Sequence, residues 1–166
     1  MTAEVAFEHA GLRVRAWQAD DREGAASIIA TVLAEYGLHF DSATADRDAY
    51  AVEESYLQPG EGGFWVVENQ AGALVGTAGL RPWSGRPGTA EVRKMYLLRE
   101  ARGRGLGRHL LAFLEAQARS LGYTRVMLET ASVLEEAVAL YESAGYRDTS
   151  EEIETRRCDR ILVKPL

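Results

Sequence analysis

Cysteine is almost absent from this sequence: Cys158 is the one cysteine among 166 residues. A single thiol excludes a disulfide within the chain and suits a reducing compartment. No apolar run is long enough to span a bilayer. The segment from Met1 to Val5 lacks the charged and apolar regions of a signal peptide. We therefore expect a cytoplasmic protein with no membrane partner.

Metal-binding patterns and repeats are missing as well. The three histidines have no partners at the spacing of a metal site, so no metal is expected. A net charge of −6 disfavours nucleic acid as a partner. There is no linker, repeat or low-complexity segment, and 46% of the residues are hydrophobic. Residues 1–166 are therefore predicted to form a single domain.

Hydrophobic periodicity predicts an α/β protein. Strands are indicated where β-branched and apolar residues alternate or cluster, and helices where apolar residues recur every three or four positions. The predicted strands are 12–17, 63–68, 73–80, 89–97, 124–129, 146–148 and 152–163. The predicted helices are about 20–36, 44–57, 103–121 and 133–144, and residues 1–10 are expected to be a loose tail. This order predicts a mixed sheet with helices on both faces.

A glycine-spaced stretch, residues 102–108, joins the strand at 89–97 to the next helix. Such a helix start exposes backbone N–H groups, which together with the helix dipole favour an anion. Glycine allows close approach to the backbone, and Arg102, Arg104 and Arg108 add positive charge. The stretch predicts a phosphate or pyrophosphate site, and the alternative is a flexible loop with solvated arginines. The dinucleotide-binding fingerprint fails because position 108 is not glycine, and no P-loop is present.

The same stretch resembles the acetyl-CoA signature of the Gcn5-related N-acetyltransferase (GNAT) superfamily. Its pattern, Gln/Arg-x-x-Gly-x-Gly/Ala, is matched by Arg102, Gly105 and Gly107. Residues 140–146 match a second family block, Leu-Tyr-x-x-x-Gly-Tyr/Phe, in the family's order and at a family-like separation. The resemblance implies an α/β fold with a mixed, mostly antiparallel sheet, helices on both faces and a splayed central parallel strand pair.

Acetyl-CoA is the cosubstrate that the resemblance implies. Its diphosphate is expected on the backbone of the glycine-spaced stretch, and its pantetheine arm beside the preceding strand. The residues implied to bind it are Met95, Tyr96, Leu97, Arg102, Gly103, Arg104, Gly105, Leu106, Gly107 and Arg108. The amide of Leu97 is the implied donor to the thioester oxygen. The acetyl end is expected in a gap between this strand and the strand at 124–130.

Two residues are predicted to be catalytic. Glu91 stands at the start of the motif strand, where the superfamily often places an acidic residue. It is the predicted general base, directly or through a water, and the alternatives are a solvent-facing glutamate at the strand end or a partner for Arg93. Tyr141 matches the tyrosine of the second block and is the predicted general acid for the departing thiolate. The alternative for Tyr141 is a core aromatic residue.

The sequence departs from the family pattern at Leu134, where many members have asparagine. The contact that asparagine makes with the cofactor must be lost or replaced, and Thr130 and Ser132 are the nearby polar residues. The acceptor stays open: the aromatic and acidic groups of the first two helices suit a small cationic amine, whereas Arg81 and Arg86 suit an acceptor carboxylate.

The predicted activity is acetyl transfer from acetyl-CoA to a primary amine of a small molecule or protein. The resemblance implies direct attack in a ternary complex. A noncatalytic acetyl-CoA-binding regulatory module is the alternative from another class, and transfer of a longer acyl chain is a third hypothesis. Dimers are common in the superfamily, so a homodimer is a further prediction.

Overall fold

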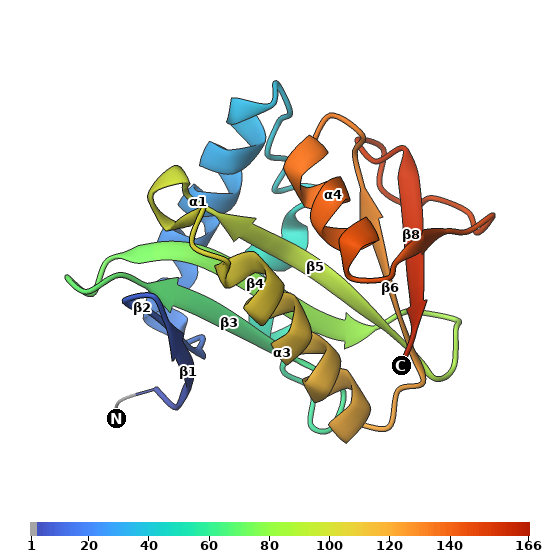
Figure 1. Ribbon diagram of the computed structural model, residues 1–166, viewed down its shortest axis with the longest axis horizontal. Coiled ribbons are helices and arrows are strands. Elements are labelled where there is room, and N and C mark those ends of the chain that lie inside the picture. Colours follow the sequence, from blue (N-terminus) through green and yellow to red (C-terminus); the bar gives the residue numbers. More distant parts are fainter. Residues whose placement is uncertain (1–2) are drawn as a thin grey trace.

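The strands of one sheet organise the chain, and the computed structural model describes residues 3–166. The strands are β1 (Val5–His9), β2 (Leu12–Ala16), β3 (Gly63–Glu68), β4 (Leu74–Pro82), β5 (Thr89–Leu97), β6 (Arg125–Thr130), β7 (Arg147–Asp148) and β8 (Arg160–Pro165). The helices are α1 (Arg22–Glu35), α2 (Val52–Tyr56), α3 (Leu106–Ser120) and α4 (Glu135–Ser143), with 3-10 helices η1 (Ala19–Asp21), η2 (Arg47–Ala49) and η3 (Arg99–Ala101). The strand order is β1-β2-β3-β4-β5-β6-β8-β7 (Figure 1).

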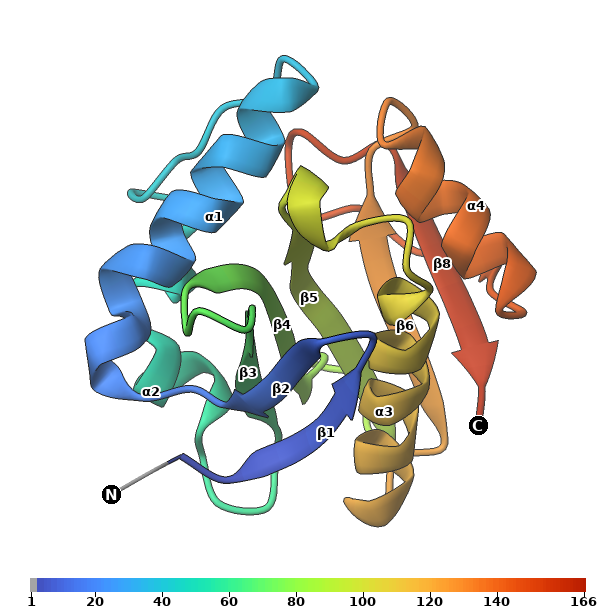
Figure 2. The same ribbon diagram turned by 60° about the vertical axis from the view of Figure 1, so that its left-hand side comes forward.

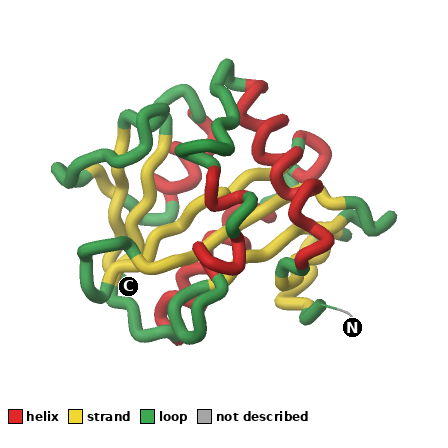
Figure 3. Tube along the Cα trace, turned by 180° about the vertical axis from the view of Figure 1, so that it is seen from behind, coloured by secondary structure: helices red, strands yellow, loops and turns green. Residues whose placement is uncertain are grey.

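A splayed parallel pair lies inside this mostly antiparallel sheet. β5 and β6 run parallel and pair from Thr89 with Arg125 to Glu91 with Met127, and no further. Beyond Glu91, β6 keeps its pairing with β8 as far as Thr130, so β5 and β6 separate. Seen from behind, the strands form one twisted layer between the helices (Figure 3). The predicted fold class, including the splayed pair, is confirmed.

The helices cover both faces of the sheet. Figure 2 shows α1 and α2 on one side of the strands and α3 and α4 on the other. Leu110, Leu111 and Leu114 of α3 are at most 1% exposed, and burying each such side chain is worth about 1.5–3 kcal/mol. Phe113 of the same helix is only partly buried and lies against Phe7 and Trp65. Among residues 3–166, no helix combines the length and apolar character needed to cross a bilayer.

A β-bulge interrupts β5. The register with β4 shifts between the Thr77–Tyr96 pair and the Gly79–Arg93 pair, so β5 has one extra residue there. Lys94 has φ 52°, a left-handed conformation that is rare for a lysine. The hydroxyl of Thr77 donates a 2.6 Å hydrogen bond to the carbonyl of Lys94 and holds the bulge. Consecutive side chains of a regular strand point to opposite faces, but Arg93 and Lys94 reach the same face.

Three predicted elements differ in the structure. The predicted loose tail contains β1, because Ala10 (φ 50°) and Gly11 (φ 79°) form a tight turn that pairs His9 with Leu12. Residues 1 and 2 of that prediction lie outside the described residues. The helix predicted at 44–57 is wrong for its first half, which contains turns and η2 before α2. There the Asp41 carboxylate accepts hydrogen bonds from the amides of Ala43 and Thr44, which competes with helix formation.

The last predicted strand starts eight residues too early. It was expected from Glu152, whereas β8 begins at Arg160. Residues 149–159 form a loop, which we call the β7–β8 loop, and Cys158 lies in it. The carboxylate of Glu129 accepts hydrogen bonds from the amides of Glu154 and Thr155, so these amides do not join a sheet. The side chain, not the strand pattern, therefore decides the course of this segment.

Asp46 anchors the β7–β8 loop to β5 through buried ion pairs. Its carboxylate is fully buried, 2.5 Å from Nζ of Lys94 and bound by both Nη atoms of Arg157 at 2.6 and 2.7 Å. Burial on its own raises the pKa of Asp46, but the hydrogen bonds from Arg157 and the charge of Lys94 lower it overall to about 2. Asp46 thus stabilises the fold in its ionised form.

Replacing Asp46 tests this anchor. Asp46→Asn is expected to lower the free energy of unfolding at pH 7 by about 3 kcal/mol, because two buried cations lose their partner. The carboxylate's pKa is depressed from 3.8 to about 2, so its contribution is present above pH 4 and is lost as pH falls through 2. Urea unfolding should therefore show the wild type and the variant converging between those values.

Glu8→Gln is the control for Asp46→Asn, because Glu8 pairs with Arg13 at the surface, where both side chains are more than half exposed. It should cost less than about 1 kcal/mol. Equal losses in the two variants, or a difference that persists unchanged to pH 2, would contradict the assignment.

Candidate functional site

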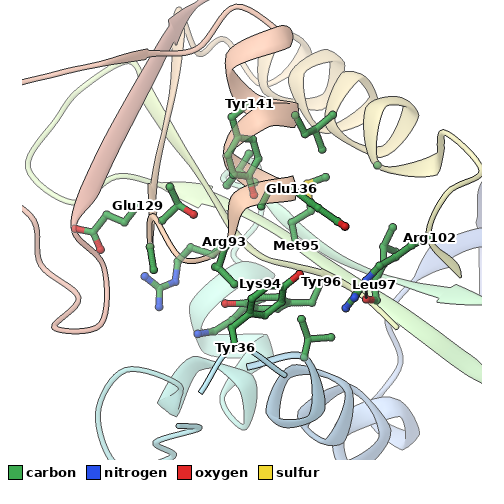
Figure 4. A pocket seen from close by; sticks show the side chains of 18 of the residues that line it. Tyr36, Arg93, Lys94, Met95, Tyr96, Leu97, Arg102, Glu129, Glu136 and Tyr141 are labelled. Carbon is green, nitrogen blue, oxygen red and sulfur yellow. Dashed lines mark hydrogen bonds between the residues drawn. The ribbon is translucent and has the colours of Figure 1, made fainter. Parts of the chain in front are cut away.

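A pocket of about 350 Å³ opens where β5 and β6 separate (Figure 4). Its walls come from β5, the glycine-spaced stretch, the end of β6, α4 and the β7–β8 loop. All but one of the residues predicted to bind the cofactor line it, namely Met95, Tyr96, Leu97, Arg102, Gly103, Gly105, Leu106, Gly107 and Arg108. Arg104 does not line it. Both predicted catalytic residues, Glu91 and Tyr141, also line it, so the fold brings the predicted site together.

The glycine-spaced stretch presents the amino end of α3 to the pocket. Gly103 (φ 73°) and Gly105 (φ 77°) adopt left-handed conformations, and Gly105 precedes the first helical residue, Leu106. No side chain caps this end, and the first turn contains no acidic residue. The first backbone N–H groups of a helix have no partner within it, so this end attracts an anion.

Gly107 and Arg102 have structural roles that the sequence did not indicate. A Cβ at Gly107 would lie 3.2 Å from Cδ2 of Leu140, so this glycine allows α3 to approach α4. Arg102 donates to the carbonyl of Leu97 and to Glu35, each at 2.8 Å. Arg104 and Arg108 are exposed. The guanidinium of Arg102 therefore braces the loop from inside the protein.

The edge of β5 that faces the pocket carries free backbone groups. The amide of Leu98 donates to the carbonyl of Val75 in β4, at 2.8 Å. Because successive amides of a strand point to opposite sides, the N–H groups of Leu97 and Met95 point away from β4. They face the gap that β6 has left. This geometry fits the expectation that an extended ligand pairs with β5 as a further strand would.

Two histidines support the same stretch, and no pattern in the sequence indicates this role. Nε2 of His9, in the turn end of β1, donates a 2.6 Å hydrogen bond to the carbonyl of Arg104. Its ring stacks on His109 at 4.0 Å, and Nδ1 of His109 donates to the carbonyl of Gly105. A carbonyl only accepts, so both nitrogens carry a proton. The expected tail therefore supports the loop, and no sequence pattern links residues 95 positions apart.

Tyr141 is buried in α4, and Figure 4 shows its side chain reaching into the pocket. Burial raises the pKa of its phenol well above the usual value, and the neighbouring Tyr96 and Cys158 add to the rise. The phenol is therefore protonated at neutral pH and able to donate. Its ring also meets Tyr146 edge-on at 5.9 Å, so the side chain has both a packing contact and a free hydroxyl in the pocket.

Glu91 meets the pocket from β5 but is already paired. Its Oε2 accepts from Nε of Arg81 at 2.9 Å, and its Oε1 from Nη1 of Arg93 at 3.1 Å. Of the two alternatives to a catalytic role, the structure contains the pairing with Arg93 but not the solvent-facing side chain. Glu91 is 6% exposed, so it can act on an acceptor only from within this pair of bonds. Its role as base stays a prediction.

Leu134 stands where many family members have asparagine. It lies at the start of α4 and lines the pocket with an apolar side chain. Of the two polar neighbours, Thr130 lines the pocket, whereas the hydroxyl and amide of Ser132 are bound to Asp159. Thr130 is thus the polar group best placed to replace asparagine. Among residues 3–166, no three His, Cys, Asp or Glu side chains gather as a metal site would require.

Known proteins are similar to this chain in sequence and in fold. The profile of the acetyltransferase (GNAT) family matches residues 27–146. The uncharacterized N-acetyltransferase YjgM of Escherichia coli is 40% identical over 129 residues, which is 76% of each chain. This chain belongs to the GNAT family and is an acetyltransferase.

Solved structures agree on the fold. A GNAT acetyltransferase from Staphylococcus aureus superposes with a TM-score of 0.83 at 19% identity, covering 93% of this chain and 98% of that one. A phosphinothricin acetyltransferase from Sinorhizobium meliloti, solved with acetyl-CoA, has a TM-score of 0.72 at 20% identity, covering 94% and 89%. These identities are low, so the likeness concerns the fold and leaves the acceptor open.

The brace at the glycine-spaced stretch leads to a binding prediction. His9→Ala is expected to weaken acetyl-CoA binding about fivefold, because one hydrogen bond worth about 1 kcal/mol no longer restrains the loop. Isothermal titration calorimetry measures this directly. His39→Ala is the control, since His39 is exposed and does not line the pocket. Wild-type affinity in His9→Ala would show that the loop keeps its shape without the hydrogen bond from His9.

Proposed function

We propose that this protein transfers the acetyl group of acetyl-CoA to a primary amine of a small molecule or protein, by direct attack in a ternary complex. The observation that carries the proposal is the open edge of β5 leading straight to the uncapped amino end of α3. An extended arm that ends in a diphosphate fits this arrangement. The whole chain, residues 1–166, is proposed to be one GNAT domain.

The cofactor is proposed to lie along these two features. Its diphosphate binds the amides of Gly103 to Arg108, with Arg104 and Arg108 supplying charge from the surface and Arg102 holding the loop. Its pantetheine arm lies beside Tyr96 and pairs with backbone groups of Met95 and Leu97. The acetyl end then enters the gap between β5 and β6, where the amide of Leu97 points and can polarise the thioester carbonyl.

In the proposed reaction a nitrogen–carbon bond forms as the carbon–sulfur bond breaks. The acceptor ammonium releases two protons, of which one ends on the sulfur of coenzyme A and one in solvent. Tyr141 is the proposed donor to the departing thiolate, since its phenol is protonated and reaches the pocket. Glu91 is the proposed base and acts through a water, because both of its oxygens are held by arginines.

A thiol-release assay tests the activity. Purified protein with acetyl-CoA should release coenzyme A when a panel of amines and amino acids is added, and mass spectrometry should find the acetylated acceptor. Propionyl-CoA and succinyl-CoA in the same assay test the preference for an acetyl group. Tight acetyl-CoA binding without turnover on any acceptor would contradict the proposal and favour a noncatalytic regulatory module. A cytoplasmic location and a homodimer stay predictions.

Tyr141→Phe tests the proton donor. The substitution keeps the ring in place and removes the hydroxyl, so kcat should fall about 100-fold while the Kd of acetyl-CoA is unchanged. Tyr123→Phe is the matched control, because the hydroxyl of Tyr123 donates to the carbonyl of Glu61, away from the pocket. Steady-state kinetics and calorimetry give both quantities. Full activity in Tyr141→Phe would show that solvent supplies the proton.

A further inference from the structure

The pocket has a second half, beyond the proposed place of the acetyl group. Its charged residues are Glu91, Arg93 and Lys94 of β5, Glu129 of β6 and Arg157 of the β7–β8 loop, and we call this set the acceptor wall. Glu91 on β5 pairs with Met127 on β6, so these two residues lie on one face of the sheet. Arg93 lies two residues after Glu91, and Glu129 two residues after Met127, so Arg93 and Glu129 share that face. In Figure 4, Glu129 and Arg93 lie on one side of the pocket and Arg102 on the other.

Positive charge exceeds negative charge in the ion-pair network behind this wall. Three carboxylates take part, those of Asp46, Asp48 and Glu91. They pair with four cations, those of Arg81, Arg93, Lys94 and Arg157. Burial lowers the pKa of Lys94, but a carboxylate on either side of its ammonium opposes the loss of the proton. The network therefore carries one unbalanced positive charge.

The unbalanced charge reaches the pocket at two guanidinium groups. The side chains of Arg93 and Arg157 are each 14% exposed, and both line the pocket. Each Nη atom of arginine bears two N–H groups. Arg157 uses its Nη atoms on Asp46 and also bonds the hydroxyl of Tyr96, and Arg93 uses its own on Glu91 and the carbonyl of Ala45. Each guanidinium thus keeps donors for a further anion, and a carboxylate is the planar partner that guanidinium groups bind best.

Negative charge without an ionic partner lies at the other end of the wall. Among residues 3–166, Glu129 forms no ion pair, and its oxygens accept hydrogen bonds from the amides of Glu154 and Thr155. These amides fix the carboxylate at the pocket. Cys158 lies between the two ends: burial raises the pKa of its thiol to about 11, Glu129 adds to the rise, and Arg157 and Arg93 oppose it.

We infer that the acceptor is a zwitterionic amino acid, whose ammonium group meets Glu129 and whose carboxylate meets Arg93 and Arg157. The inference rests on the proposed acetyl transfer and names its substrate class. A simple cationic amine would add positive charge beside a network that already has an excess. An amino acid adds none in total and offers each end of the wall the opposite charge, so the cost of desolvating these side chains is best offset.

A panel of matched acceptors tests the substrate class. Phenylalanine, phenylalaninamide and phenethylamine share a side chain and an amino group, and only the first carries a carboxylate. With saturating acetyl-CoA, kcat/KM should be about 100-fold higher for the amino acid than for either analogue, because a buried charge-assisted pair is lost. Leucine with leucinamide, and alanine with alaninamide, repeat the comparison for other side chains.

The Arg157 side chain is tested against a neighbour in the same loop. Arg157→Gln should raise the KM of the amino acid about tenfold and reduce the preference for the amino acid over its amide analogue by the same factor. Arg156→Gln is the control, since Arg156 is exposed in the same loop and does not line the pocket. Arg157→Gln can unfold the protein, because Asp46 loses a partner. In that case Arg157→Lys replaces it, since lysine keeps the charge and loses the paired donors of the guanidinium. The acceptor panel on the wild-type protein decides the substrate class without either variant.

The outcomes separate the two proposals. Equal kcat/KM for amino acids and their amides or amines overturns the amino-acid inference and leaves acetyl transfer standing. A larger kcat/KM for the amines overturns it in the same way. No turnover with either set, although acetyl-CoA binds, overturns the proposed function and the inference with it. A preference for the carboxylate that Arg157→Gln reduces and Arg156→Gln retains supports the assignment of the wall.

Discussion

The separation of β5 from β6 is the constraint on which the site depends. Pairing stops after Glu91 and Met127, yet β6 continues beside β8. The carbonyl of Leu97 accepts from Arg102, but the amides of Met95 and Leu97 on the freed edge of β5 still need a partner, and buried backbone groups are rarely left unpaired. A ligand with its own amides can take that place. The proposed path of pantetheine follows from this need, and the uncapped end of α3 lies where that path ends.

The bulge in β5 decides what lies on the acceptor side. A lysine held at positive φ costs of order 1–3 kcal/mol, and such strain persists only where surrounding contacts over-determine it. Here the contacts are the Thr77 hydroxyl and the carboxylates of Asp46 and Asp48. The bulge puts Arg93 and Lys94 on one face, beside the start of the gap. The same local distortion therefore assembles the ionic network and gives the acceptor wall its positive end.

The N-terminal hairpin of β1 and β2 supports the glycine-spaced stretch from outside the part of the chain that matches the family profile. That match begins at residue 27, whereas β1 and β2 precede it. His9 bonds the carbonyl of Arg104, and the side chain of Arg104 reaches back to the carbonyl of Ala10. Each segment thus donates a hydrogen bond from a side chain to a backbone carbonyl of the other. The edge of the sheet in this way supports a loop whose sequence follows the family pattern.

Local patterns in the sequence determined the α/β class, most strands, the turn at Gly103 to Gly107 and the face of α3, because these depend on spacing along the chain. They also indicated the family, and all but one of the residues that they assigned to the cofactor line the pocket. Only the tertiary structure decided that β1 is a strand, that the segments at 44–51 and 149–159 are irregular, and which charges meet. Asp46 and Arg157 are 111 positions apart, and Glu129 holds amides 25 and 26 positions away. Such partners compete with local hydrogen bonds and become available only once the sheet brings distant segments together.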